Sequence, residues 1–125
     1  MTNNEISGAI VDAAMKVHSQ LGPGLLESAY EKCLLYELHK RGLQAQAQVE
    51  VPVLYDEIKI DAGFRLDLLV ENTVIVELKA VEAVLPIHHA QILTYLKLSG
   101  KPIGLLINFN VQHLRDGIKR FVKKT

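Results

Sequence analysis

The sequence predicts an α/β fold in which a mixed β-sheet of about five strands is flanked by helices, in the order ααββββαβα. Three observations predict it. Two segments near the N-terminus repeat apolar residues at helical spacing. The middle of the chain holds strand-like runs rich in Val, Leu and Ile. A strand, a helix and a second strand from Val74 to Ile107 then fit a right-handed crossover.

Length and composition limit the class of protein. The 125 residues suit a single domain, 1–125, with its own core. The formal net charge is zero, so any binding of nucleic acid must come from a local patch rather than from bulk charge. The lone Cys33 excludes an internal disulfide. Because neither a secretory signal nor an apolar run of ~20 residues is present, we expect a cytoplasmic protein that does not span a membrane.

Two helices are expected first. One covers about Glu5–Leu21, with Asn3 or Asn4 as its cap. The other covers about Leu25–Arg41 and carries Glu27 in its first turn. Taken alone, Glu27 is explained by the helix dipole, which rewards an acid there by about 0.3–1 kcal/mol.

Two strands should follow the helices. Gln44–Leu54 alternates apolar and polar residues, which predicts a strand with one wet face, and Pro52 places it at a sheet edge. Tyr55–Ala62 continues as a short second strand. Gly63 then bends the chain into the next hairpin.

The central hairpin is Phe64–Val81, two apolar strands joined by a loop at Glu71–Thr73. A loop of this length pairs Val70 with Val74, whereas a two-residue loop would mismatch the apolar faces. The shared apolar face then holds Leu66, Leu68, Val70, Val74, Val76, Leu78 and Ala80.

The other face of this hairpin carries charges among aliphatic residues. In the same register Asp67 lies opposite Glu77, and Arg65 lies opposite Lys79, with paired Cβ atoms ~5 Å apart. Two carboxylates that close repel unless a cation lies between them. Mg²⁺ is a natural partner for such a pair, and a lysine can stabilise charge on a phosphoryl oxygen. The alternative is an exposed hairpin with a salt bridge, and the aliphatic neighbours favour the site.

A third helix is expected over about Ile87–Ser99, after a loop at Ala80–Pro86. His88, Gln91 and Tyr95 share one stripe of it. Pro102–Phe109 is apolar throughout, as in a strand buried on both faces.

A last helix should begin at Asn110, with Val111, Leu114, Ile118 and Phe121 facing inward. Its outer side would carry Arg115, Lys119, Arg120, Lys123 and Lys124. A solvated basic face and a phosphate-contacting patch explain this pattern equally well.

Four short motifs occur in order along almost the whole chain. They are Gly24-Leu-Leu-Glu27-Ser-Ala-Tyr30, the single acid Asp67, Glu77-Leu-Lys79 and Gln91-Ile-Leu-Thr-Tyr95. In this arrangement the sequence resembles the GxxExxY protein family of the PD-(D/E)XK nuclease superfamily. Leu66 stands where the superfamily's name has proline.

The resemblance implies a restriction-endonuclease-like core and a metal site. Asp67 and Glu77 would bind Mg²⁺ or Mn²⁺ together with the carbonyl of Leu78. Glu27 would hold a water at this ion or a second ion. Gly24 would let the start of the second helix lie close to the sheet.

The resemblance also implies roles around the metal. Lys79 would position or help deprotonate the attacking water, Gln91 would hydrogen-bond the site or a substrate phosphate, and Tyr95 would stack on or orient it. Candidate substrate contacts are Tyr30, His88, Arg115, Lys119 and Arg120, with His89 a further candidate. Core packing explains Tyr30 equally well, and surface exposure is the commoner role for the two histidines.

The expected function is metal-assisted hydrolysis of a phosphodiester in nucleic acid, with DNA favoured over RNA. A homodimer would suit the cutting of two strands. One alternative is a binding or assembly module that keeps a nuclease fold without turnover, and another is a hydrolase of small phosphate esters. A zinc or thiol enzyme is disfavoured, because Cys33 stands alone on an apolar helix face.

Overall fold

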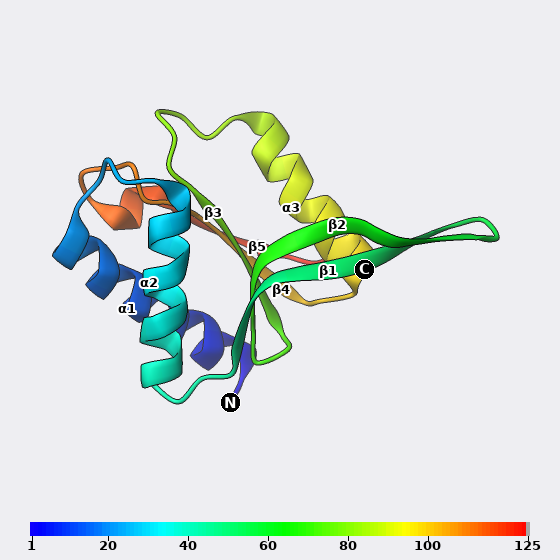
Figure 1. The fold of residues 1–125 in the computed structure, drawn as a ribbon, viewed down its shortest axis with the longest axis horizontal. Coiled ribbons are helices and arrows are strands. Elements are labelled where there is room, and N and C mark those ends of the chain that lie inside the picture. Colours follow the sequence, from blue (N-terminus) through cyan, green and yellow to red (C-terminus); the bar gives the residue numbers. More distant parts are fainter. Residues whose placement is uncertain (125) are drawn as a thin grey trace.

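In the computed structural model, which describes residues 1–124, a five-stranded mixed sheet separates two layers of helix (Figure 1). The strand order is β1-β2-β3-β4-β5, with β3 and β4 parallel and the other neighbours antiparallel. The α/β class and the mixed sheet are confirmed. The elements are α1 (Asn3–Leu21), α2 (Glu27–Lys40), β1 (Ala45–Tyr55), β2 (Ile58–Val70), β3 (Val74–Lys79), α3 (Pro86–Ser99), β4 (Ile103–Asn108), the short 3₁₀ helix η1 (Leu114–Gly117) and β5 (Ile118–Val122).

The prediction of a separate strand at Tyr55–Ala62 was wrong in its boundary. The chain turns at Asp56, whose φ is 55°, and β2 then runs through Gly63 without a break. A Cβ on Gly63 would collide with the Val53 side chain, so glycine allows β1 and β2 to pass closely here. The predicted second and third strands are therefore one.

The prediction of a final helix from Asn110 was also wrong. After η1, residues Ile118–Val122 pair with the free edge of β4, with Ile107 opposite Ile118 and Ile103 opposite Val122. The edge of a buried strand offers unpaired backbone groups, and a β-rich segment satisfies them better than a helix does. Gly117 fits where a Cβ would meet the carbonyl oxygen of Asn108.

The first helix begins at Asn3 rather than Glu5, and its cap is Thr2 rather than either asparagine. The Thr2 hydroxyl accepts the Glu5 N–H at 3.1 Å, and the Glu5 carboxylate accepts the Thr2 N–H at 2.8 Å. This reciprocal capping box satisfies two backbone donors, which one asparagine cap does not.

Two hydrophobic clusters lie on opposite sides of the sheet. The larger cluster joins α1 and α2 to the sheet, and its centre is the stacked pair Tyr30 and Phe109, with ring centroids 4.5 Å apart. The smaller cluster packs Ile92 and Leu96 of α3 against Ile75 and Leu106. No helix in the described part of the chain is long and apolar enough to cross a bilayer.

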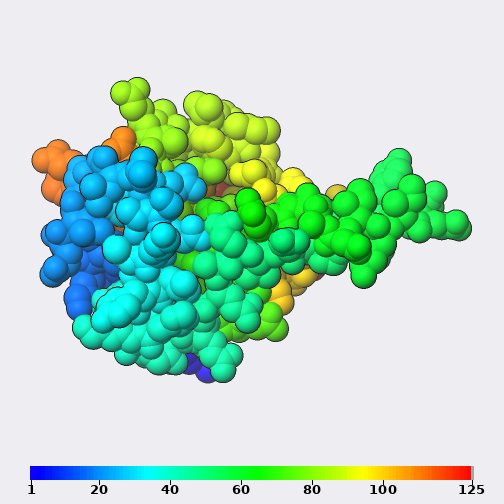
Figure 2. Space-filling view, in the orientation of Figure 1, coloured from blue at the N-terminus to red at the C-terminus, as the bar shows by residue number. Residues whose placement is uncertain are grey.

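The outer halves of β1 and β2 project from the body as a two-stranded ribbon (Figures 1 and 2). This ribbon, residues 52–62, is called the arm below. Its last pair is Tyr55 opposite Ile58. Pro52 lies at its base, and β1 is the edge strand, as predicted.

Candidate active site

The β2–β3 hairpin has the predicted register as far as it stays paired. Val70 lies opposite Val74, and the ladder continues to Leu68 opposite Val76. Beyond that pair two carboxylates replace the ladder bonds. Glu77 Oε2 accepts the N–H of Asp67 at 3.0 Å, and Asp67 Oδ2 accepts the N–H of Leu78 at 2.8 Å.

Asp67 and Glu77 therefore lie side by side, each held by the other strand's backbone. The prediction that Arg65 faces Lys79 was wrong, because the ladder has already ended and Arg65 is exposed to solvent. Each carboxylate uses one oxygen for a backbone N–H in these bonds. The second oxygen of each remains as a site for a cation or a donor.

A bend in β1 lies opposite the acids. Gln48 has a φ of 54°, and the β1–β2 partners omit it, passing from Ala47–Leu68 to Val49–Leu66. Across this irregularity Leu66 packs with the α3 cluster rather than with Leu68, so its predicted face was wrong. Such irregularities re-aim side chains, and this one coincides with Asp67.

The acids carry an electrostatic cost. Glu77 is only 5% exposed. Burial first, and then the charge of Asp67, raise the pKa of Glu77 to about 8. Burial also raises the pKa of Asp67, although the N–H of Leu78 opposes this shift. A cation beside the two carboxylates would relieve both effects.

Lys79 lies half-buried at the end of β3, and its backbone is firmly anchored. Its carbonyl accepts the N–H of Phe109 at 2.9 Å. The buried Asn108 lies opposite Lys79 in the β3–β4 ladder and binds both backbone groups of Val81. Its Oδ1 accepts the Val81 N–H at 3.1 Å, and its Nδ2 donates to the Val81 carbonyl at 2.9 Å. Sequence reasoning missed Asn108, although a polar residue at the end of an apolar strand was a visible signal.

Glu27 reaches the site from the first turn of α2. Glu27 is exposed as a residue, yet partial burial of its carboxyl raises its pKa, and the charge of Asp67 raises it further. The positive charge of Lys79 lowers the pKa of Glu27. The structure thus brings all four predicted charges, Glu27, Asp67, Glu77 and Lys79, into mutual electrostatic range.

Two other motif residues have different roles from those predicted. Tyr30 is 0% exposed, so its assignment as a substrate contact was wrong. Its hydroxyl donates to the Gly22 carbonyl at 2.6 Å and accepts the Leu25 N–H at 3.1 Å, which fixes the turn before α2. Gly24 is explained by its φ of 98° rather than by close approach, because a Cβ there would meet nothing within 4 Å.

Two polar neighbours of the acids were not predicted. Glu31, one turn after Glu27 on α2, lies close enough for its charge to raise the pKa of Asp67. Gln48 donates to Glu31 at 2.7 Å and lies beside Asp67 at the bend in β1. The spacing of four between the two glutamates was a signal that they share a helix face.

On α3, Tyr95 is the residue that faces the acids. It stacks on Phe64 with ring centroids 4.5 Å apart. Burial raises its pKa, as do the charges of Glu77 and Asp67. Gln91 is half-buried one turn earlier, whereas His88 uses Nδ1 to accept the N–H of Leu85 at 3.0 Å and so stabilises the start of the helix.

The basic residues do not form one face, because the last element is a strand. Lys119 lies 5.6 Å from the ring centroid of Phe121, on the α3 side. Arg120 points to the other side and donates to Asn4 of α1 at 2.7 Å. Arg115 lies on η1, in a hollow it shares with His18 of α1. A continuous phosphate-binding face of these residues is therefore not present.

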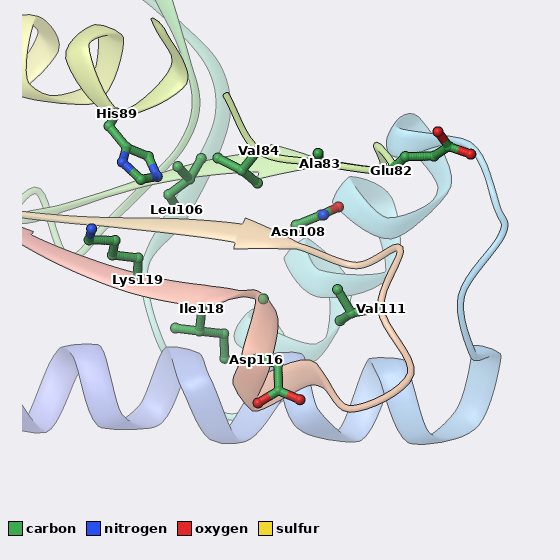
Figure 3. A pocket seen from close by; sticks show the side chains of 11 residues that line it. Glu82, Ala83, Val84, His89, Leu106, Asn108, Val111, Asp116, Ile118 and Lys119 are labelled. Carbon is green, nitrogen blue, oxygen red and sulfur yellow. The ribbon is translucent and has the colours of Figure 1, made fainter. Parts of the chain in front are cut away.

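A hollow of about 350 Å³ lies one strand away from the acids, between β4, β5 and the start of α3 (Figure 3). His89 and Lys119 lie toward one end of it, and Glu82 and Asp116 toward the other (Figure 3). Its wall includes Leu106 and Asn108, the ladder partners of Glu77 and Lys79. The hollow is thus a neighbour of the site rather than the space between the acids.

Asp67 and Glu77 suit a metal ion that leaves some coordination positions to water or substrate. Within residues 1–124, no group of three or more His, Cys, Asp or Glu side chains is arranged to hold an ion by itself. Mg²⁺ is commonly bound by one or two carboxylates, with water and substrate phosphate as the other ligands. Glu77 is buried and Asp67 is half-buried, and their mutual repulsion fits that mode of binding.

The comparisons with known proteins decide the family. Residues 4–121 match the family model described as the PD-(D/E)XK nuclease superfamily. The chain belongs to this superfamily. Such nucleases generally use divalent metals, and their substrate is nucleic acid.

One solved structure resembles the chain in its fold. The chain described as "Crystal structure of SSO0001" aligns with a TM-score of 0.53 and 22% sequence identity. The match covers 78% of this chain and 50% of that one, so the protein spans about half the length of this structural relative. At this identity the likeness concerns the fold alone. No curated protein matches the sequence.

Proposed function

We propose that this PD-(D/E)XK protein is a nuclease that hydrolyses phosphodiester bonds with Mg²⁺ or Mn²⁺, with DNA as the favoured substrate. The proposal rests on two neighbouring hydrogen bonds beside Lys79. The Glu77 carboxylate accepts the N–H of Asp67, and the Asp67 carboxylate accepts the N–H of Leu78. A salt-bridged hairpin on the surface would not place a buried and a half-buried acid side by side so that both pKa values rise. The GxxExxY family is the branch that the motifs favour.

Asp67 and Glu77 are the proposed metal ligands, with the carbonyl of Leu78 as a third. Glu27 is proposed to bind a water or second ion at the outer side of this pair. A divalent ion there would neutralise phosphate charge and favour ionisation of the attacking water. The cost of burying the acids would then be offset when the ion binds.

The chain's own groups would complete the site. The Lys79 amine would hold the attacking water and stabilise charge on a phosphoryl oxygen. Tyr95, supported by Phe64, would orient the substrate, and Gln91 would donate to a phosphate oxygen. Lys119 and His89, at the rim of the neighbouring hollow, would contact the nucleic acid farther along. A cytoplasmic location and a single domain stay predictions.

The test is a cleavage assay on single- and double-stranded DNA and RNA, with Mg²⁺ or Mn²⁺. Asp67→Ala and Lys79→Ala should each reduce the rate at least ~100-fold, since removal of one electrostatic group at a site commonly costs that much. Arg65→Ala, a charge on the same strand but outside the site, is the matched control and should cleave normally. Equal behaviour of wild type and the two site variants on every substrate would refute the proposal.

Metal binding can be measured without turnover. In calorimetric titration, Asp67→Asn should weaken Mn²⁺ binding sharply, because the substitution removes a ligand charge while keeping the side-chain shape. Unchanged affinity would place the ion elsewhere. A protein that retains DNA in chelator and never cuts it in Mg²⁺ or Mn²⁺ would be a binding module instead.

A further inference from the structure

The arm is a two-stranded ribbon with no support from the body of the chain (Figures 1 and 2). Its pairs are Val53–Ile60, Leu54–Lys59 and Tyr55–Ile58, and it begins after an irregularity next to Val51. An isolated hairpin is marginally stable in water. A ribbon that extends from the body in this way gains stability when another surface covers it.

One face of the arm is apolar. Directly paired residues share a face and successive residues alternate, so Val53, Tyr55, Ile58 and Ile60 lie together. Tyr55 is 72% exposed and Ile58 is 61% exposed. A contiguous apolar face on a projecting element marks an interaction surface.

The charge of the arm indicates which kind of surface covers it. Asp56, Glu57 and Asp61 lie at and near its tip, against the single base Lys59. This acidic excess repels the phosphates of nucleic acid. It favours a partner surface that is both apolar and basic.

The same chain carries such a surface. Residues 86–124 contain seven Lys and Arg residues and one acid, Asp116. Within this part, a hollow of about 450 Å³ is lined by Leu93, Thr94, Lys97 and Lys124. Among residues 1–124, its lining thus combines an aliphatic side chain with two amines and contains no carboxylate, which complements the tip of the arm.

The arm and this hollow lie at the same end of the molecule. At the base of the arm, Phe64 stacks on Tyr95 of α3, and Val51 belongs to the same cluster as Leu93. The arm itself points away from the body, so its tip is directed to a neighbour rather than to its own hollow (Figure 1). A two-fold axis beside this end would make both arm-to-hollow contacts at once and close the assembly.

We propose that the arm docks on the α3 hollow of a second copy, which gives an arm-exchanged homodimer. The apolar face of each arm covers Leu93 and the stem of Lys97 of the other copy. The acids at the tip face the amines of Lys97 and Lys124. The proposal concerns assembly and does not depend on nuclease activity.

Sedimentation of the full chain over about 1–100 µM tests the apolar contact. Wild type should dimerise in this range. Tyr55→Ser with Ile58→Ser should raise the dimer dissociation constant at least ~10-fold, because two exposed anchors are lost. Leu54→Ser is the matched control: Leu54 is 74% exposed on the opposite face of the arm, and its substitution should leave the constant unchanged.

Reversal of charge tests the identity of the docking surface. Asp56→Lys with Asp61→Lys should weaken the dimer, as should Lys97→Glu with Lys124→Glu. The chain that carries all four substitutions should dimerise more tightly than either pair. Circular dichroism spectra should keep the wild-type shape throughout, because every site is on the surface, while the melting temperature should follow the strength of the dimer.

Three outcomes would overturn the proposal. They are a wild type that stays monomeric at the highest concentration, arm variants that dimerise as well as wild type, and charge reversals that add rather than compensate. A monomer whose arm variants lose DNA binding would assign the arm to nucleic acid instead.

Discussion

The two faces of the sheet differ in how completely the helices cover them. In the described residues, α1 and α2 build a cluster of twenty buried side chains, whereas α3 covers the other face with seven. Glu77 alternates with Ile75 of the smaller cluster along β3, so the more deeply buried of the two acids lies on the thinly covered face. The difference indicates that the face under α1 and α2 supplies most of the folding stability, whereas the face under α3 can hold groups that lower this stability.

Adjacent residues on β4 allow the sharpest test of this comparison. Ile107 belongs to the larger cluster and is 0% exposed, while Leu106 belongs to the smaller one and lines the 350 Å³ hollow. A Leu→Ala or Ile→Ala change in a core costs about 2–5 kcal/mol, and the cost falls where surroundings can relax or admit water. Ile107→Ala should therefore lie near the top of that range and Leu106→Ala near the bottom. Urea unfolding of both variants measures the difference, and equal losses would contradict the comparison.

The acids themselves should lower the stability of the metal-free protein. The pKa of Glu77 is about 8 in the folded protein, against 4.5 for an unperturbed carboxyl. A raised pKa of an acid means that the unfolded chain releases its proton first, so stability should fall as pH rises from about 4.5 to about 8.

Glu77→Gln should therefore stabilise the metal-free protein at pH 8 by about 2–4 kcal/mol and flatten this dependence. The measurement is urea unfolding in chelator at pH 5 and pH 8. Asp12→Asn, at an exposed position of α1, is the matched control and should change nothing. A Glu77→Gln variant that is less stable than wild type at pH 8 would show that the carboxylate supports the fold.

The helix starts give the smallest effects. On the well-covered face, Thr2 caps α1, and Thr2→Ala should cost about 1 kcal/mol. On the other face, the N-cap residue of α3 is Leu85, whose side chain makes no capping hydrogen bond, so Leu85→Asp should gain about 0.5–1 kcal/mol. Thermal melting of both variants checks the opposite signs. A loss in both variants would mean that the exposed Leu85 side chain has a packing role.

The sequence predicted the features that depend on local pattern. The loop at Glu71–Thr73 fixed which residues pair, and the odd count placed Asp67 and Glu77 together. The apolar run at Pro102–Phe109 predicted a strand buried on both faces. The hairpin register and the buried strand both follow from the periodicity of apolar residues and the loop length. These depend only on residues that are close together in the sequence.

The features that were missed depend on distant partners. Residues 118–122 have apolar positions that suit a helix as well as a strand, and only the free edge of β4 decides between them. The turn-fixing role of Tyr30 needs Gly22 and Leu25 at the same point in space. The bend at Gln48, where the β1–β2 partners also omit Asp67, is a feature that no local pattern marks.

The two hydrogen bonds from Asn108 to Val81 anchor the backbone between Lys79 and the loop that leads to α3. Lys79 is tied through its own carbonyl to Phe109, and the amide of Asn108 secures the backbone two residues later. Loop residues beyond Val81, such as Glu82 and Ala83, can thus be lengthened or exchanged without moving the amine. Engineering of the segment before α3 would in this way reshape the hollow that Glu82 and Ala83 line, while Lys79 keeps its position.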